Sequence, residues 1–234
     1  MIEENKVLAI IPARGGSKGI PKKNIINVGG KPLIYYSINV AKKSKFIGRV
    51  IVSTDSKEIA EMAEKNGARV PFIRPSELAR DDTPTYPVIK HVLEWLNEKE
   101  NYRPELIVIL EPTFPLRTVK EVDEAIKAIS SDKEADSLRG VCEPFQNPFK
   151  MWLLNGKYLE PLIKTEKETH GMPRQKLKKV FWQNGFIYIS RYKTIMEKGD
   201  IAGEKILPFI LGKNKYIDLD TKEDLELLRW YLEK

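Results

Sequence analysis

A glycine- and lysine-rich segment near the start of the chain has the composition of a phosphate-binding loop. It follows an apolar run and reads Pro12-Ala-Arg-Gly-Gly-Ser-Lys-Gly-Ile-Pro-Lys-Lys-Asn24. Its glycines carry no Cβ, so backbone N–H groups can approach phosphate oxygens closely. Four basic side chains suited to a polyphosphate accompany them: Arg14, Lys18, Lys22 and Lys23. A solvated surface loop is the alternative, but a position directly after a first strand favours a ligand site.

The spacing of this loop excludes two familiar nucleotide-binding motifs. The glycines fit neither GxGxxG nor the GxxxxGK motif that ends in Ser or Thr. The sequence therefore indicates a phosphate loop of another kind.

Two carboxylates near the other end of the chain form a second candidate site. Asp218 and Asp220 lie two residues apart near the end of a strand expected at 215–219, so both side chains should share one face. Hard oxygen ligands without a nearby His or Cys favour Mg²⁺ over zinc. The alternative is that Asp218 faces solvent and Asp220 only precedes the last helix. That helix needs no cap from Asp220, because Thr221 and Asp224 have capping-box spacing.

The elements that must position these residues alternate between strands and helices. Apolar runs predict strands at 7–11, 50–52, 69–73, 106–110, 186–189 and 215–219. Helical periodicity predicts helices at 32–43, 56–66, 85–99, 118–130 and from Thr221 onwards. Capping-box spacing marks two of the helix starts, with Asp55 and Glu58 at one and Thr118 and Glu121 at the other. Such alternation predicts a mostly parallel sheet with helices on both faces.

The alternation of predicted strands and helices is interrupted in the middle of the chain. Residues 136–189 contain irregular, proline-punctuated pieces, and we interpret them as an excursion within a single domain that spans 1–234. This excursion is a candidate dimerisation arm. Its apolar residues would also suit a core layer, and they are Phe145, Phe149, Met151, Trp152, Leu153 and Leu154.

Composition excludes several other classes of protein. The chain has 234 residues and a formal net charge of +7, but no arginine-rich tract, so a nucleic-acid binder is disfavoured. One cysteine, Cys142, allows no internal disulfide and suits a reducing compartment. No apolar run reaches the ~18 residues of a membrane helix, and residues 1–6 do not read as a secretion signal. We expect a cytoplasmic protein that does not bind membranes.

Motifs along nearly the whole chain resemble those of the nonulosonate (acylneuraminate) cytidylyltransferases. Besides the run Ile10–Asn24, the matching segments are Val52-Ser-Thr-Asp55, Arg74-Pro-Ser-Glu-Leu-Ala79, Pro112-Thr113, Pro115-Leu-Arg117, Asn184-Gly185 and Ile217-Asp-Leu-Asp-Thr221. The resemblance implies a Rossmann-like, three-layer αβα nucleotidyltransferase and a homodimer. It also implies a reaction in which CTP and a sialic-acid-like sugar acid give a CMP-sugar and pyrophosphate with Mg²⁺.

The resemblance also assigns roles to particular residues. Arg14, Lys18 and, at the far end, Lys22 would hold the triphosphate within a loop that includes Ala13, Gly15, Gly16, Ser17 and Asn24. Arg74 and Thr85 would contact the cytosine base. The sugar acid would meet Glu111, Lys150, Arg174 and Asn184, and the metal would bind Asp218 and Asp220. The anomeric hydroxyl of the sugar is the nucleophile in this family, so no Ser/His/Asp arrangement is required.

Two positions depart from the family pattern on the sugar side. Glu111 stands where a glutamine is usual, and Trp182 stands where a basic residue is common. These changes make the sugar pocket more negative, so the sugar need not be N-acetylneuraminate. They leave open a nucleotidyltransferase that acts on an NTP and a sugar 1-phosphate. A non-catalytic nucleotide-binding protein is a more distant alternative, because the phosphate loop and both metal carboxylates are present.

Overall fold

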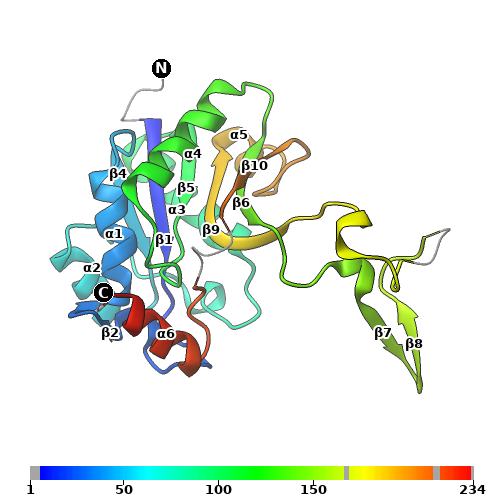
Figure 1. Ribbon diagram of the computed structural model, residues 1–234. Helices are drawn as coiled ribbons and strands as arrows, with labels where there is room; N and C mark the ends of the chain where they lie inside the picture. Colours follow the sequence, from blue (N-terminus) through cyan, green and yellow to red (C-terminus); the bar gives the residue numbers. More distant parts are fainter. Residues whose placement is uncertain (1–5, 166–168, 213–216, 233–234) are drawn as a thin grey trace.

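A six-stranded sheet runs through the middle of the molecule in the computed structural model, which describes residues 6–165, 169–212 and 217–232 (Figure 1). The strand order is β10-β6-β9-β5-β1-β4. The strands are β1 (Val7–Pro12), β4 (Arg49–Ser53), β5 (Leu106–Ile109), β6 (Ser137–Cys142), β9 (Trp182–Arg191) and β10 (Ile206–Ile210). Only β9 is antiparallel to its neighbours, β5 and β6. The expected mostly parallel sheet is confirmed.

Helices cover both faces of this sheet. They are α1 (Leu33–Lys43), α2 (Lys57–Lys65), α3 (Thr85–Glu100), α4 (Val119–Ser131), α5 (Tyr192–Met196) and α6 (Lys222–Leu232). Side chains of a strand alternate between faces, so Ala9 and Ile11 of β1 pack with α1, α2 and α4. Leu8 and Ile10 pack with α3 and α5 on the opposite face. The result is the predicted three-layer αβα arrangement.

The helix starts agree with the sequence in two cases and differ in one. Thr118 and Glu121 form the expected capping box at α4. The helix predicted at 56–66 is present as α2, but the predicted Asp55–Glu58 capping box was wrong, because Ser56 caps that helix and accepts a hydrogen bond from the N–H of Ile59. Asp55 is therefore free for a different contact, which is described below. Thr221 and Asp224 exchange the reciprocal hydrogen bonds that were expected before α6.

Two predicted strands are not formed as expected. Residues 69–73 contribute only isolated bridges, from Arg69 to Ile51 and from Ile73 to Thr54. Pro71 lies between them and lacks the N–H that a continuous ladder would need. Part of the strand expected at 215–219 lies outside the described residues, and residues 217–219 have no strand pairing.

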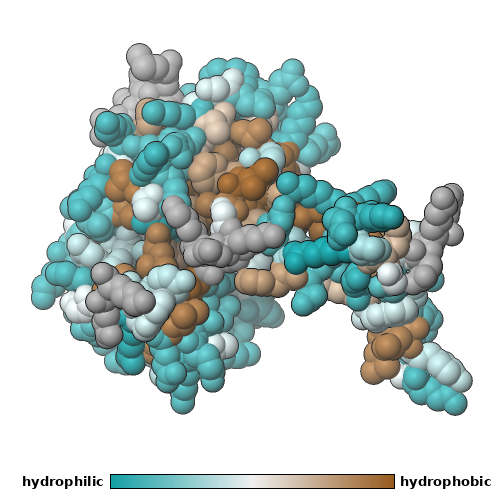
Figure 2. All heavy atoms as spheres, in the orientation of Figure 1, coloured by the Kyte–Doolittle hydropathy of each residue, from teal (hydrophilic) through white to brown (hydrophobic). Residues whose placement is uncertain are grey.

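The middle of the chain forms an arm that projects from the sheet, as Figure 1 shows. It spans residues 143–181, which corrects the boundaries 136–189, because residues 137–142 and 182–191 belong to the sheet as β6 and β9. The arm carries a hairpin of β7 (Trp152–Asn155) and β8 (Tyr158–Pro161). Apolar side chains are exposed on this hairpin (Figure 2). A second small hairpin, β2 (Asn27–Val28) and β3 (Lys31–Pro32), precedes α1.

Among the helices of the described residues, none has the length and apolar composition needed to cross a bilayer.

Candidate active site

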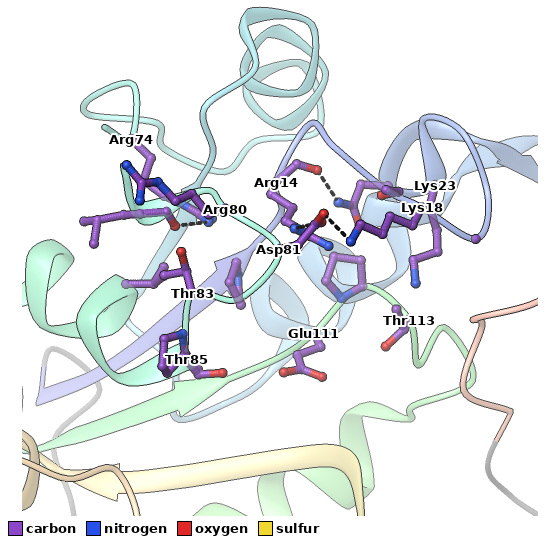
Figure 3. Close-up of a pocket in the computed structure, with 18 of the residues that line it drawn as sticks. Arg14, Lys18, Lys23, Arg74, Arg80, Asp81, Thr83, Thr85, Glu111 and Thr113 are labelled. Carbon is purple, nitrogen blue, oxygen red and sulfur yellow. Dashed lines mark hydrogen bonds and ion pairs between the residues drawn. The ribbon is translucent and has the colours of Figure 1, made fainter. Parts of the chain in front are cut away.

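A cavity of about 520 Å³ opens where β1 and β5 end (Figure 3). Three segments and Asp220 enclose it: the loop 12–24 after β1, the loop 74–85 that leads into α3, and residues 111–113 after β5. Ligands of open α/β sheets bind at the carboxyl ends of the strands. The phosphate loop predicted from the sequence therefore lies at the edge of the sheet where a ligand is expected.

Backbone contacts hold the phosphate loop in place. The N–H of Ala13 donates to the carbonyl oxygen of Ser53, and the N–H of Gly15 donates to Oδ1 of Asp55 across 2.8 Å. Nδ2 of buried Asn24 donates to the carbonyl oxygen of Arg14 across 2.9 Å. These bonds make Asn24 a support for the loop as well as one of the residues that line the cavity.

The basic side chains of the loop point in different directions. Arg14 and Lys18 line the cavity, and both contact the carboxylate of Asp81, as Figure 3 shows. Lys22 is not among the residues that line the cavity, and its Nζ lies 2.7 Å from Glu58. Lys23 lines the cavity instead and contacts Oδ1 of Asp220 across 2.8 Å.

The left-handed conformation of Lys22, at φ 53°, separates these two neighbouring lysines. Ser17 also lines the cavity, whereas Ala13, Gly15 and Gly16 do not.

Arg74 and Thr85, the predicted base-contacting residues, lie together on one wall of the cavity. Arg74 is buried and donates to Oγ and the carbonyl oxygen of Ser53 and to the carbonyl oxygen of Leu78. Burial lowers the pKa of its guanidinium to about 10, against the opposing effect of Asp55. An arginine held in this way is a fixed donor rather than a flexible surface charge.

Carboxylates gather near the turn after β5. Burial raises the pKa of Glu111 to about 7; the nearby charges of Asp218 and Asp220 add to this rise, and Arg117 opposes it. Burial also raises the pKa of Asp218 to about 6, with a further contribution from Asp220. The ionised carboxylates are close enough to repel one another, so a cation between them would be stabilised.

The segment 217–220 is docked against the turn after β5. The N–H of Leu219 donates to the carbonyl oxygen of Thr113 across 3.0 Å, and Ile217 and Leu219 are buried in a cluster with α6. Asp218 and Asp220 alternate with them and face the other side, next to Glu111. The shared face predicted for the two aspartates is therefore present, although it lies on an extended segment without strand pairing.

These carboxylates suit Mg²⁺ in the type of their donor atoms. Within residues 6–165, 169–212 and 217–232, no group of three or more His, Cys, Asp or Glu side chains could hold a metal ion. Mg²⁺ commonly binds one or two carboxylates, with water and substrate phosphates as its other ligands. Asp218 and Asp220 fit this pattern.

The predicted sugar-side residues are dispersed in a single chain. Glu111 lines the cavity, and Asn184 is buried; a Cβ on the next residue, Gly185, would lie 3.3 Å from Oε2 of Glu111. Lys150 and Arg174 are on the arm, where Arg174 lines a separate cavity of about 390 Å³ and donates to the carbonyl oxygen of Pro144. Neither arm residue lines the nucleotide cavity of its own chain.

The sequence analysis gave no role to four residues that line the cavity: Arg80, Asp81, Thr83 and Thr113. It named Lys23 among the basic residues of the loop but assigned the far end of the triphosphate to Lys22. Lys22 and Lys23 are adjacent lysines of the same loop, so their residue type and position did not distinguish them. Thr113 lies within the matched Pro112-Thr113 motif but was given no role. Nothing in the sequence distinguished Asp81 from the neighbouring Asp82.

Several known proteins are similar to this chain in sequence or in fold. A protein of Campylobacter jejuni subsp. jejuni serotype O:2, "Pseudaminic acid cytidylyltransferase", is 34% identical over 228 residues, which are 96% of this chain and 95% of the relative. The "N-acylneuraminate cytidylyltransferase" of Streptococcus agalactiae serotype III is 30% identical over 94% of this chain and 51% of its own length. This chain therefore spans about half of that relative.

A solved structure of CMP:2-keto-3-deoxy-manno-octonic acid synthetase complexed with CTP has a similar fold. Its TM-score is 0.71 at 17% sequence identity, with 97% of this chain and 98% of that chain covered. The family model described as "Cytidylyltransferase" matches residues 8–204. With most of its length inside that match, the chain belongs to the cytidylyltransferase family.

Proposed function

We propose that this enzyme transfers the CMP group of CTP to the anomeric hydroxyl of a nonulosonic sugar acid. The observation that carries the proposal is the cavity at the end of β1 and β5, which is lined by the cations Arg14, Lys18 and Lys23 and by the carboxylates of Glu111 and Asp220. A cavity lined by both kinds of group suits a triphosphate next to a hydroxyl-rich acceptor. The names of the two sequence relatives, both of which end in cytidylyltransferase, support the same reaction.

In the proposed reaction, the anomeric oxygen forms a bond to the α-phosphorus of CTP in line with the leaving group. The bond from the α-phosphorus to the oxygen that bridges to the β-phosphorus breaks, and pyrophosphate leaves with that electron pair. The hydroxyl proton goes to solvent. Arg14, Lys18 and Lys23 would neutralise the charge that develops on the α-phosphoryl oxygens and on pyrophosphate. Arg74 and Thr85, which also line the cavity, would hold the base.

We assign Mg²⁺ to Asp218 and Asp220, which would hold it beside the triphosphate. When bound, Mg²⁺ would supply additional neutralisation of phosphate charge. The chain's own contribution is to fix the two carboxylates, through the bond from Leu219 to Thr113, and to pair Asp220 with Lys23.

We further propose that the enzyme is a homodimer in which the arm of one subunit completes the sugar site of the other. This is supported by the exposed apolar side chains on the arm hairpin: Leu153, Leu154, Tyr158 and Leu159. It is also supported by the position of Lys150 and Arg174, which lie on the arm and could clamp a carboxylate only if a second chain brings them to its cavity. A cytoplasmic location stays our proposal, supported by the single buried cysteine without a disulfide.

The reaction can be tested by measuring pyrophosphate release with CTP and Mg²⁺. The acceptors are N-acetylneuraminate, pseudaminic acid, a deaminated nine-carbon analogue, 3-deoxy-octulosonate and glucosamine 1-phosphate, each with a control that lacks acceptor. We expect turnover with at least one sugar acid, and loss of that turnover in Arg14→Ala.

Release with glucosamine 1-phosphate alone would replace this proposal with a sugar-1-phosphate nucleotidyltransferase. Absence of release from CTP with every acceptor, with CTP still bound, would favour a non-catalytic nucleotide-binding protein.

A further inference from the structure

The carboxylate of Asp81 bridges two cations of the phosphate loop. Its Oδ1 lies 2.5 Å from a guanidinium nitrogen of Arg14, and its Oδ2 lies 2.7 Å from Nζ of Lys18. Figure 3 shows the three side chains meeting in the cavity, with Asp81 approaching from the loop 74–85 and the two cations from the loop after β1. One carboxylate therefore ties together the two loops that enclose the cavity.

The contacts of the Asp81 carboxylate with Arg14 and Lys18 resemble the contacts that a phosphate group would make. Each oxygen binds a different cation, as two oxygens of a polyphosphate would do when held by an arginine and a lysine. The hydrogen bonds from Lys18 and Arg14 lower the pKa of Asp81, so the carboxylate is ionised at neutral pH. A phosphate and the Asp81 carboxylate would therefore compete for the same donors.

The bridge is also open to solvent, which makes it exchangeable. The side chains of Asp81 and Lys18 are 45% and 78% exposed, and that of Arg14 is 31% exposed. Exposed ion pairs contribute little to stability and are weakened by salt. A highly charged ligand can displace Asp81 from such exposed ion pairs, whereas it could not reach an ion pair buried in the core.

We propose that Asp81 is an intramolecular competitor of the phosphate groups. Its carboxylate forms ion pairs with Arg14 and Lys18 in the absence of ligand. These ion pairs break when a polyphosphate binds the two cations, and they form again when pyrophosphate leaves. The inference rests on the proposed function for the identity of the anion, CTP entering and pyrophosphate leaving. The consequence is that Asp81 lowers the affinity for both and speeds the release of pyrophosphate.

The test uses inorganic tripolyphosphate, which binds phosphate donors without needing the base or the sugar. Its dissociation constant is measured by calorimetry, without Mg²⁺, for the wild-type protein, Asp81→Asn and the control Asp82→Asn. Asp82 is exposed, adjacent and equally charged, but it is not among the residues that line the cavity. Circular dichroism and thermal unfolding check that each variant is folded.

We expect Asp81→Asn to bind tripolyphosphate about fivefold more tightly than wild type at low salt, since two exposed ion pairs no longer compete. Asp82→Asn should change the affinity less than about twofold, because only long-range charge is altered. The gain in Asp81→Asn should shrink in about 0.5 M salt. In the enzyme assay, pyrophosphate should inhibit Asp81→Asn at lower concentration than it inhibits wild type.

Equal or weaker binding by Asp81→Asn would overturn the inference and make Asp81 a residue that orients the two cations for phosphate. The same gain in Asp82→Asn would also overturn it, as would no binding by any of the three proteins at low salt. The proposed function fails separately: a protein with no turnover on any sugar acid can still show the selective gain in Asp81→Asn.

Discussion

The Asp55 carboxylate accepts a hydrogen bond from the backbone N–H of Gly15 across 2.8 Å. This bond fastens the phosphate loop to the residue that follows the end of β4 by two positions. A Cβ on Gly15 would lie 3.1 Å from Cβ of Ser56, so the two segments are also in close contact. Asp55 thus determines the position of the loop without lining the cavity itself.

Removal of this bond should weaken nucleotide use. We expect Asp55→Ala to lower kcat/KM for CTP by about tenfold, because the loop loses a charge-assisted hydrogen bond. Asp55→Asn keeps an acceptor oxygen and should lose less. Glu61 is exposed on α2, so Glu61→Gln removes the same charge away from the loop and serves as the control. Steady-state kinetics would contradict the role if Asp55→Ala and Glu61→Gln behaved alike.

The two adjacent lysines should differ in their effect on catalysis. Lys23 lines the cavity and Lys22 contacts Glu58 outside it. We expect Lys23→Ala to lower kcat/KM by about tenfold or more, since phosphate charge is left less neutralised, and Lys22→Ala to lower it less than about threefold. An equal tenfold loss in both variants would mean that Lys22 leaves Glu58 to reach the triphosphate.

Glu111 should limit which sugar acid is accepted. An ionised carboxylate at this position would repel a substrate carboxylate, while accepting hydrogen bonds from hydroxyl or amino groups. We expect Glu111→Gln to raise kcat/KM for N-acetylneuraminate by about threefold or more, with little change in KM for CTP. No gain in a folded variant would show that Glu111 does not face the sugar.

The same substitution should change how stability depends on pH. Burial raises the pKa of Glu111 from 4.5 to about 7, so its protonated form is favoured in the folded state. The stability that this provides is complete below pH 4.5 and lost as the pH rises through 7. Relative to wild type, Glu111→Gln should therefore gain stability across this window, by about 1 kcal/mol or more at pH 8.

Urea unfolding at pH 4.5, 6 and 8, in EDTA, measures that difference. A difference between the two proteins that is the same at all three pH values would exclude titration of Glu111 as its cause.

The arm hairpin should control the oligomeric state. Leu154 and Leu159 are paired across the hairpin and exposed. We expect Leu154→Lys combined with Leu159→Lys to produce a monomer, because charges would enter an apolar interface, and to reduce sugar-acid turnover at least tenfold. Sedimentation velocity measures the state. Replacement of exposed Lys157, in the turn of the same hairpin, by Gln is the control and should leave a dimer.

Much of the fold could be predicted because its signals are local. Continuous apolar runs indicated β1 and β5, and the Thr118–Glu121 box located the start of α4. The direction of β9 could not be predicted in this way, since an apolar run has the same pattern whether its neighbours are parallel or antiparallel. The limits of the arm were misplaced for a related reason: β6 contains Ser137, Arg139 and Gly140 and lacks a continuous apolar run.

The site was predicted less completely, because its details depend on contacts between distant segments. Lys22 and Lys23 are equivalent by residue type, and only the left-handed backbone at Lys22 separates them. Asp55 and Glu58 have capping-box spacing, yet Asp55 binds a loop 40 residues away and Ser56 caps the helix. Local propensity could not have predicted that Asp55 accepts a hydrogen bond from Gly15 and not from the first turn of α2.

The arm leaves and rejoins the sheet at neighbouring positions, since Cys142 and Trp182 are paired between β6 and β9. Residues 143–181 therefore form an insertion whose two ends lie side by side on neighbouring strands of the sheet. A change in its length or sequence need not shift the strands at whose ends the cavity lies. Because the arm is proposed to complete both the sugar site and the dimer, we expect exchange of this segment between relatives to alter the acceptor and the dimer partner together and to leave recognition of CTP intact.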